Sequence, residues 1–316
     1  MMANAWYLCK LRSTYPRGLA IVRLPRPQLA QKLAQKLAKK LVAKPVEKPG
    51  AEVQPQTANQ AGSLRAGSLR VHGAKTTSTP SVIDVAIWRG GEHGRYVSYR
   101  VPAEANQTVL DVVTWVQRNL EPSLSYRFAC RVGVCGSCAM TVNGRPRWTC
   151  RTHVSRVLGD GRLEIGPLAN LPVIKDLATD MTRFFDKWQA AHGRFVPSKT
   201  RHDDVALILP SSTARVEADK AIECINCAVC FSACDTVRWN KYYAGPAALN
   251  RAWTLVNDER DAGNADRLAA VSARGGCHSC HTHQSCAELC PSGLNPTASI
   301  TGLKRRTMRA FIKGEL

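Results

Sequence analysis

The sequence predicts an α+β protein in which a small mixed domain precedes an all-α domain. Strand-like alternation and one capped helix occur early in the chain, whereas helical periodicity dominates after residue 200. The third observation is the distribution of cysteine. Of 13 cysteines in 316 residues, twelve form three groups, one in the mixed part and two in the helical part. Each domain is therefore expected to be organised around its cysteines.

Residues 1–80 differ in composition from the rest of the chain. They contain 14 Lys and Arg against Glu47 and Glu52, and so carry +12 of the formal net charge of +20. The near-repeats QKLAQKLAKKL and AGSLRAGSLR favour a basic low-complexity tail, either disordered or targeting. A basic amphipathic helix is the alternative, because apolar residues recur there at helical spacing. These residues are Leu29, Leu33, Leu37 and Leu41.

Charge, hydropathy and cysteine content exclude several classes of protein. The basic excess lies mostly in the tail and lacks interleaved aromatic residues, so we expect no nucleic-acid binding. No run of about 18 apolar residues is present, and the first ten residues have no charged segment before an apolar one. Thirteen cysteines without an export signal favour metal-bound thiolates in a reducing compartment. Cys9 stands alone and is given no role.

The first elements of the mixed domain are two strands and a helix. VIDVAIWR and YVSYRV alternate in polarity as strands do. Thr108 and Asp111 form a capping box before an apolar helical face. That face comprises Val109, Val112, Val113, Val116 and Leu120. AMTV and RPRWTC flank Asn143-Gly144, which predicts a hairpin with a type I′ turn.

The first cysteine group lies beside this hairpin. Cys130, Cys135, Cys138 and Cys150 follow the plant-type [2Fe-2S] spacing C-x4-C-x2-C-x11-C. Gly133 and Gly136 let the backbone adopt positive φ around a cluster, and the hairpin returns Cys150 toward Cys138. Residues 81–170 are therefore predicted to form a β-grasp [2Fe-2S] ferredoxin domain.

Helical patterns follow. LPVIKDLATDMTRFFDKW, within residues 171–200, predicts a helix that joins the two domains. Its apolar side comprises Ile174, Leu177, Met181, Phe184, Phe185 and Trp188. In residues 201–316, GPAALNRAWTLVND and NPTASITGLKRRTMRAF predict two further helices, the second opening at Pro296. The apolar face of the first comprises Leu249, Ala252, Trp253 and Val256.

The second and third cysteine groups match a two-cluster ferredoxin. Cys224, Cys227, Cys230 and Cys234 form the bacterial run C-x2-C-x2-C-x3-C, whose fourth cysteine binds the other cluster. A second such run, followed by proline, is present downstream with one exception, since His283 replaces its middle cysteine. The second run consists of Cys280, His283, Cys286 and Cys290. Seven thiolates are therefore available.

Seven thiolates divide as four and three. Cys224, Cys227, Cys230 and Cys290 would hold a [4Fe-4S] cluster, and Cys234, Cys280 and Cys286 a [3Fe-4S] cluster. Cys277 or His283 could instead complete a fourth iron position in the last cluster. The segment starting at Cys277 also reads C-x-x-C-H, a haem c or zinc pattern. Because the cysteines of this segment from Cys280 onward already fit the second ferredoxin run, neither a haem c site nor a zinc site is favoured.

Five segments of residues 81–313, in order, carry a resemblance to a known family. They are SLSYRFACRVGVCGSCAM, PLANLPVIKDL, ECINCAVCFSAC, GPAALNRAW and CAELCPSGLNPT. The chain resembles the iron-sulfur subunit of succinate dehydrogenase and fumarate reductase. The resemblance implies a subunit that passes electrons one at a time from a flavoprotein carrying FAD to a quinone beside a membrane anchor. Catalytic acids and bases are not expected in this chain.

The resemblance also implies a quinone site at Trp239 and His281. Near it the sequence departs from the family pattern, with Asp235 in place of a common Pro and Arg238 in place of a frequent Trp. Val132 stands at a position that is often acidic. The first two departures leave open which quinone is used, and the ligand pattern does not distinguish succinate oxidation from fumarate reduction.

The implied location is peripheral on the inner, energy-transducing membrane, on the cytoplasmic face in a bacterium or the matrix face in a mitochondrion. Two alternatives stay open at this stage. The chain could be the iron-sulfur subunit of another flavin-dependent dehydrogenase, or a zinc or nucleic-acid-binding protein with a basic tail.

Overall fold

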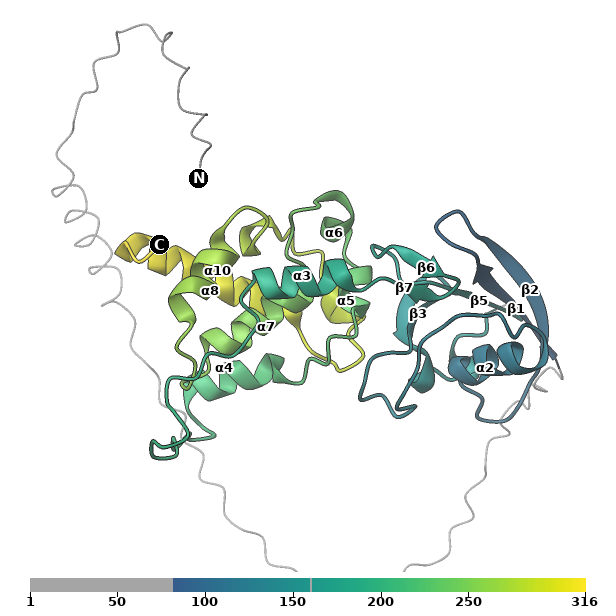
Figure 1. The fold of residues 1–316 in the computed structure, drawn as a ribbon, viewed down its shortest axis with the longest axis horizontal. Coiled ribbons are helices and arrows are strands. Elements are labelled where there is room, and N and C mark those ends of the chain that lie inside the picture. The colour runs from purple at the N-terminus through teal and green to yellow at the C-terminus, as the bar shows by residue number, and fades with distance from the viewer. Residues whose placement is uncertain (1–81, 160) are drawn as a thin grey trace, which may run out of the picture. The chain divides into compact units, whose positions relative to one another are not determined.

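The structure, a computed structural model, describes residues 82–159 and 161–316. The predicted basic tail, Cys9 and the leucine-rich segment from Leu29 to Leu41 lie outside these residues. Two sheets are present in the described part (Figure 1). Their strands are β1 (Val82–Arg89), β2 (Arg95–Pro102), β3 (Ala139–Val142), β4 (Arg145–Trp148), β5 (Arg162–Gly166), β6 (Val173–Lys175) and β7 (Ala178–Thr179).

The larger sheet has the strand order β2-β1-β5-β3-β4 and confirms the mixed first domain. β1 pairs with β2 in antiparallel register along its whole length, while β5 lies parallel on its other side, with Val85 opposite Leu163. The predicted hairpin joins β3 to β4. Its turn residues Asn143 and Gly144 have φ values of 47° and 73°, as a type I′ turn requires.

Helix α2 (Val109–Asn119) covers this sheet and begins at the predicted capping box. The Thr108 hydroxyl oxygen accepts from the Asp111 amide at 3.2 Å, and the Thr108 amide donates to the Asp111 carboxylate at 3.0 Å. The four valines of the predicted face are buried against the sheet. Leu120 was wrongly included in that face, because it is the C-terminal cap and is 47% exposed.

The expected helix over LPVIKDLATDMTRFFDKW is wrong in its first half. Strands β6 and β7 form a hairpin there, and α3 begins only at Thr182. Asp176 at the turn has φ of 53°, and its buried carboxylate accepts from the Arg89 guanidinium and from two backbone amides. Because those donors belong to residues far away in sequence, helical periodicity did not reveal them.

The second domain is all-α, as predicted, and its helices surround α7 (Pro246–Val256). The predicted apolar face of α7 is buried, and this helix packs against α4 (Thr213–Ile222) and α10 (Pro296–Lys313). Pro296 opens α10, where the Asn295 side chain caps the helix. The helices after α2 are α3 (Thr182–Ala190), α4 (Thr213–Ile222), α5 (Val229–Ser232), α6 (Asp235–Trp239), α7 (Pro246–Val256), α8 (Asn264–Ser272), α9 (Ser285–Glu288) and α10 (Pro296–Lys313). Short 3-10 turns cover Thr149–Arg151, Val154–Arg156 and Cys277–Ser279.

A fully buried ion pair fastens the loop after α3 to α8. The Arg267 guanidinium donates to both Asp261 carboxylate oxygens, at 2.7 and 3.1 Å, and both side chains are 0% exposed. Arg267 also donates to the carbonyl oxygens of His192 and Arg194, and Asp261 accepts from the Val196 amide. Every charge in this group therefore has a partner, which a buried pair needs in order to be tolerated.

Among the helices that the structure describes, none combines the length and the apolar character needed to cross a membrane.

Candidate metal centres

The first cysteine group lies on a loop whose backbone amides face its own sulfur atoms. The Val134 amide donates to the Cys130 sulfur at 3.3 Å, and the Cys130 amide donates to the Cys135 sulfur at 3.5 Å. Gly133 and Gly136 have φ values of 78° and 70°, which confirms the prediction made for them. Amide donors of this kind stabilise the negative sulfur atoms of a bound cluster.

The β3–β4 hairpin brings the last cysteine of this group to the loop. Cys138 and Cys150 flank the hairpin, and the Thr149 hydroxyl and amide both donate to the Cys138 carbonyl oxygen, at 2.8 and 3.3 Å. Burial, a hydrogen bond and the charge of Cys138 raise the pKa of Cys150 to about 12. The backbone amides of nearby residues lower the pKa of Cys130 to about 6.

Three thiols of the second group and one of the third line one small cavity. Cys224 and Cys227 line it from the turn before α5, Cys230 lines it from α5 itself, and Cys290 lines it from the turn after α9. Burial raises the pKa of each of the first three thiols, most strongly for Cys230, which the charges of its neighbours raise further. A metal ion that binds here must therefore displace the thiol protons. The buried thiolates are stable only when positively charged metal ions balance their charge. This donor set fits a cubane cluster.

The remaining three thiols of the two runs gather around Tyr243. Cys234, Cys280 and Cys286 each act on the buried Tyr243 hydroxyl, and the pKa of that phenol is raised by burial and by their negative charge. The Thr282 amide donates to the Cys280 sulfur at 3.4 Å, and the Cys286 sulfur lies 3.3 Å from the Thr297 hydroxyl. Burial raises the pKa of Cys286 to about 11.

Cys277 and His283, the two alternatives for an eighth ligand, point to other neighbours. Cys277 is fully buried, and its sulfur lies 3.8 Å from the Thr307 hydroxyl of α10. His283 is exposed, and its ring meets Trp239 edge-on with centroids 6.4 Å apart.

The residues implied for a quinone site lie together on the surface. Trp239 is the last residue of α6 and is 71% exposed. The His281 and His283 rings are 6.1 Å apart, so His283 is a neighbour of both Trp239 and His281. Arg238 and Asp235 are also exposed on α6.

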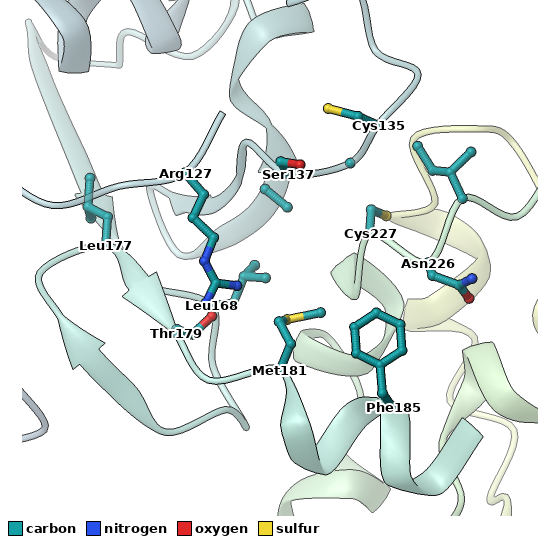
Figure 2. A pocket seen from close by; sticks show the side chains of 13 residues that line it. Arg127, Cys135, Ser137, Leu168, Leu177, Thr179, Met181, Phe185, Asn226 and Cys227 are labelled. Atoms are coloured by element: carbon teal, nitrogen blue, oxygen red, sulfur yellow. The ribbon is translucent and has the colours of Figure 1, made fainter. Parts of the chain in front are cut away.

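The first two cysteine sites meet where the two domains join, within one compact unit of the fold. A Cβ atom on Gly136 would lie 2.6 Å from the Cys227 Cβ, so only glycine allows this approach. Beside it lies a cavity of about 340 Å³. Figure 2 shows Cys135 and Ser137 on its first-domain side, Asn226 and Cys227 across from them, and Met181 and Phe185 by α3.

Asn170 fastens the same junction. Its amide nitrogen lies 3.0 Å from the carbonyl oxygens of Phe231 and Ser232 and 3.2 Å from that of Cys234. The backbone at Asn170 has φ of 65°, a conformation that asparagine tolerates better than most residues. This contact and the Tyr243 environment were missed in the sequence, because their partners are distant along the chain. For the Asn170 contact, the available sequence signal was the single asparagine in the segment PLANL.

The fold and sites define a protein of two ferredoxin-type modules, one for a single [2Fe-2S] cluster and one for two clusters. Two family models agree. Residues 84–186 match a 2Fe-2S iron-sulfur cluster binding domain, and residues 223–295 match a 4Fe-4S dicluster domain.

Curated relatives extend the match over both modules. The fumarate reductase iron-sulfur subunit of Escherichia coli is 34% identical over 215 residues, covering 68% of this chain and 86% of the relative. The mitochondrial succinate dehydrogenase [ubiquinone] iron-sulfur subunit 1 of Oryza sativa is 34% identical over 210 residues, covering 66% and 74%. A chain in the solved apo Sdh1 complex of Mycobacterium smegmatis matches with a TM-score of 0.64 and 27% identity, covering 72% and 95%.

The chain therefore belongs to the family of succinate dehydrogenase and fumarate reductase iron-sulfur subunits. It is an electron-transfer subunit with a [2Fe-2S] and a [4Fe-4S] domain. This membership argues against the zinc-protein alternative, because both family models describe iron-sulfur domains.

Proposed function

We propose that this chain passes electrons one at a time between an FAD-containing flavoprotein, which interconverts succinate and fumarate, and a membrane quinone. Three ligand sets hold the clusters. They are Cys130, Cys135, Cys138 and Cys150 for [2Fe-2S], then Cys224, Cys227, Cys230 and Cys290 for [4Fe-4S], then Cys234, Cys280 and Cys286 for [3Fe-4S].

The observation that carries the proposal is the exchange of cysteines between the two runs. Cys290 lines the cavity of Cys224, Cys227 and Cys230, although it follows them by a long stretch of chain. The exchange leaves Cys234 with two thiols of the later run, around Tyr243. Each cluster then joins two segments that are distant in the chain. Binding of the clusters therefore also stabilises the folded helical domain.

The count of three irons in the last cluster rests on the surroundings of the two remaining candidates. Cys277 packs against Thr307 of α10, and His283 faces Trp239. A three-thiolate site favours a cubane that lacks one iron.

The clusters supply one-electron carriage, and the protein residues supply position, shielding and hydrogen bonds. Gly136 permits the first loop to reach Cys227 closely, which shortens the separation between the first two sites. Burial of Cys230 and Cys286 keeps water from the second and third sites. Amide donors such as Val134 stabilise negative sulfur and so influence the reduction potential.

At the quinone end we assign Trp239 and His281. An indole N–H can donate to a quinone oxygen, and an imidazole can hold or transfer a proton. Their exposure suits residues that complete a site together with another subunit. Arg238 adds a positive charge beside Trp239, so Arg238→Trp should change KM for quinones of different head group while the cluster spectra stay the same. Unchanged quinone kinetics would remove Arg238 from this site.

The partners in this proposal are the flavoprotein and a membrane anchor, and the location is peripheral on the inner, energy-transducing membrane. The face is cytoplasmic in a bacterium and matrix in a mitochondrion. We also propose the division into residues 1–80, 81–170, 171–200 and 201–316. The second family model lies within the fourth segment, whereas the first reaches from the second segment into the third, to residue 186.

Electron paramagnetic resonance of the anaerobically isolated complex, together with iron and zinc analysis, tests the proposal. Oxidised protein should show a three-iron signal. Cys290→Ser should lose the four-iron signal of reduced protein, Cys286→Ser should lose the three-iron signal, and Cys277→Ser should keep both. Two four-iron clusters in the wild type, or loss of the last cluster in Cys277→Ser, would contradict the ligand assignment.

A further inference from the structure

Trp148, the last residue of β4, lies between the first two cysteine sites. Its ring packs under the first loop, where a Cβ atom built on Gly133 would lie 3.4 Å from Trp148 Cε3. On another side it lines a cavity of about 300 Å³ together with Cys290, which the proposed function assigns to the four-iron cluster. β4 also packs against α5, the helix that carries Cys230. Trp148 is therefore placed to act on both sites.

The polar atom of Trp148 has no ordinary partner. The indole Nε1 is completely enclosed and makes no hydrogen bond to the described residues. A buried N–H group without a partner costs about 1–3 kcal/mol, so natural proteins rarely leave one. Within the described residues, the other enclosed indole nitrogen without a partner is that of Trp188, which lies on α3.

The indole lies among thiols assigned to the four-iron site. Trp148 and Cys230 belong to one buried cluster, and Cys227 packs against that cluster. Cys227 also meets Gly136 of the first loop. An N–H group that is unsatisfied in the protein alone thus lies beside thiols that become anionic when metal binds.

Resting on the ligand set assigned above, we propose that Trp148 is a positioning residue for electron transfer. Its indole N–H donates to a thiolate of the loaded four-iron site and raises the reduction potential of that cluster. Reduction adds negative charge, so a donor to a cluster sulfur stabilises the reduced state more than the oxidised state. The first domain would then tune the second cluster through a residue that binds no iron.

Trp148→Phe in the intact complex tests the proposal, because phenylalanine keeps an aromatic ring but has no N–H. Redox titration followed by electron paramagnetic resonance should show the four-iron midpoint about fivefold less favourable to reduction, or ~40 mV lower at 59 mV per tenfold change. The three-iron midpoint should not move. A four-iron midpoint equal to that of the wild type would overturn the proposal.

Trp188→Phe is the matched control, since it also removes an enclosed indole N–H without a partner. Trp188 packs on Gly193 and lines a cavity that contains no cysteine. All three midpoints should therefore stay at wild-type values in this variant. An equal fall of the four-iron midpoint in both variants would mean that the shift reflects a general loss of packing, and the proposal would be wrong.

A measurement on the unmodified protein keeps the proposal testable even if Trp148→Phe fails to assemble. Protein labelled with ¹⁵N in tryptophan should show a nitrogen hyperfine coupling to the reduced four-iron cluster in pulsed resonance spectra. Trp188→Phe should retain this coupling. A normal four-iron spectrum without it would remove Trp148 from the site, whereas absence of the four-iron spectrum itself would contradict the proposed function.

Discussion

Replacing Gly136 with alanine tests whether the approach between the first cysteine loop and Cys227 contributes to stability and function. Two separate costs follow from the structure. The backbone has φ of 70°, a left-handed conformation that costs about 1–2 kcal/mol with a side chain. In addition, the new Cβ would lie 2.6 Å from the Cys227 Cβ and 2.9 Å from its Cα, and such overpacking costs about 1–3 kcal/mol.

Gly144→Ala separates these two costs. Gly144 has φ of 73°, and no atom lies within 4 Å of a Cβ built there. Gly144→Ala therefore has the conformational cost of the left-handed backbone without the steric cost. For a unit of this size, 1 kcal/mol lowers the melting temperature by roughly 2–4 °C. Gly144→Ala should lower it by about 2–8 °C, and Gly136→Ala by a further 2–12 °C or so.

Anaerobic calorimetry with iron analysis measures both effects. Beyond its lower melting temperature, Gly136→Ala should slow electron transfer from the [2Fe-2S] site to the next, because the two loops must separate to admit the methyl group. Equal melting temperatures in the two variants, or unchanged transfer in Gly136→Ala, would refute the reasoning that the loops touch at this point.

Three further predictions concern polar side chains that are buried or partly buried. Asp261→Asn should destabilise the protein by about 3–5 kcal/mol, because it leaves the buried Arg267 charge unpaired; a loss below 1 kcal/mol in denaturant titration would argue against this. Asn170→Ala should lower the free energy of unfolding by about 1–3 kcal/mol and speed hydrogen exchange next to Cys234. Unchanged exchange there would contradict the role of the Asn170 side chain in holding the domain junction. Burial lowers the pKa of Lys187 from 10.5 to about 8, so the unfolded chain binds more protons between these values and stability should rise from pH 8 to 10.5. Lys187→Met should lack this rise, and a wild-type slope in that variant would assign the rise to another group.

Local patterns predicted most of the first domain. Both opening strands, the capping box at Thr108 and the turn at Asn143-Gly144 occur where the sequence places them. Each depends on residues close together in the chain, for which hydrophobic period and turn chemistry are sufficient. The order β2-β1-β5-β3-β4 was not predicted, because β5 pairs with β1 across a long separation.

Residues 171–181 show where local patterns mislead. Their apolar spacing suits a helix, yet Ile174 is 60% exposed and Leu177 is buried, as in a strand hairpin. The buried Asp176 carboxylate favours the hairpin over a helix, because in the hairpin it accepts hydrogen bonds from Arg89, Gly90 and Ser125. A helix through this segment would break those bonds and leave a charge buried without partners.

By itself the sequence determined that one domain is of the [2Fe-2S] type and the other of the [4Fe-4S] type, because the spacing of cysteines along the chain limits which thiols can share a metal. The division of the seven later thiols between two clusters is a prediction from the same spacing. It also determined the family, through five segments in order. Only the tertiary structure decided which neighbours face each site. Gly136 lies against Cys227, Trp148 shares a cavity with Cys290, and Tyr243 lies among three thiols, and each of these contacts joins residues from separate elements. Such contacts depend on how strands and helices pack, and no local period in the sequence records them.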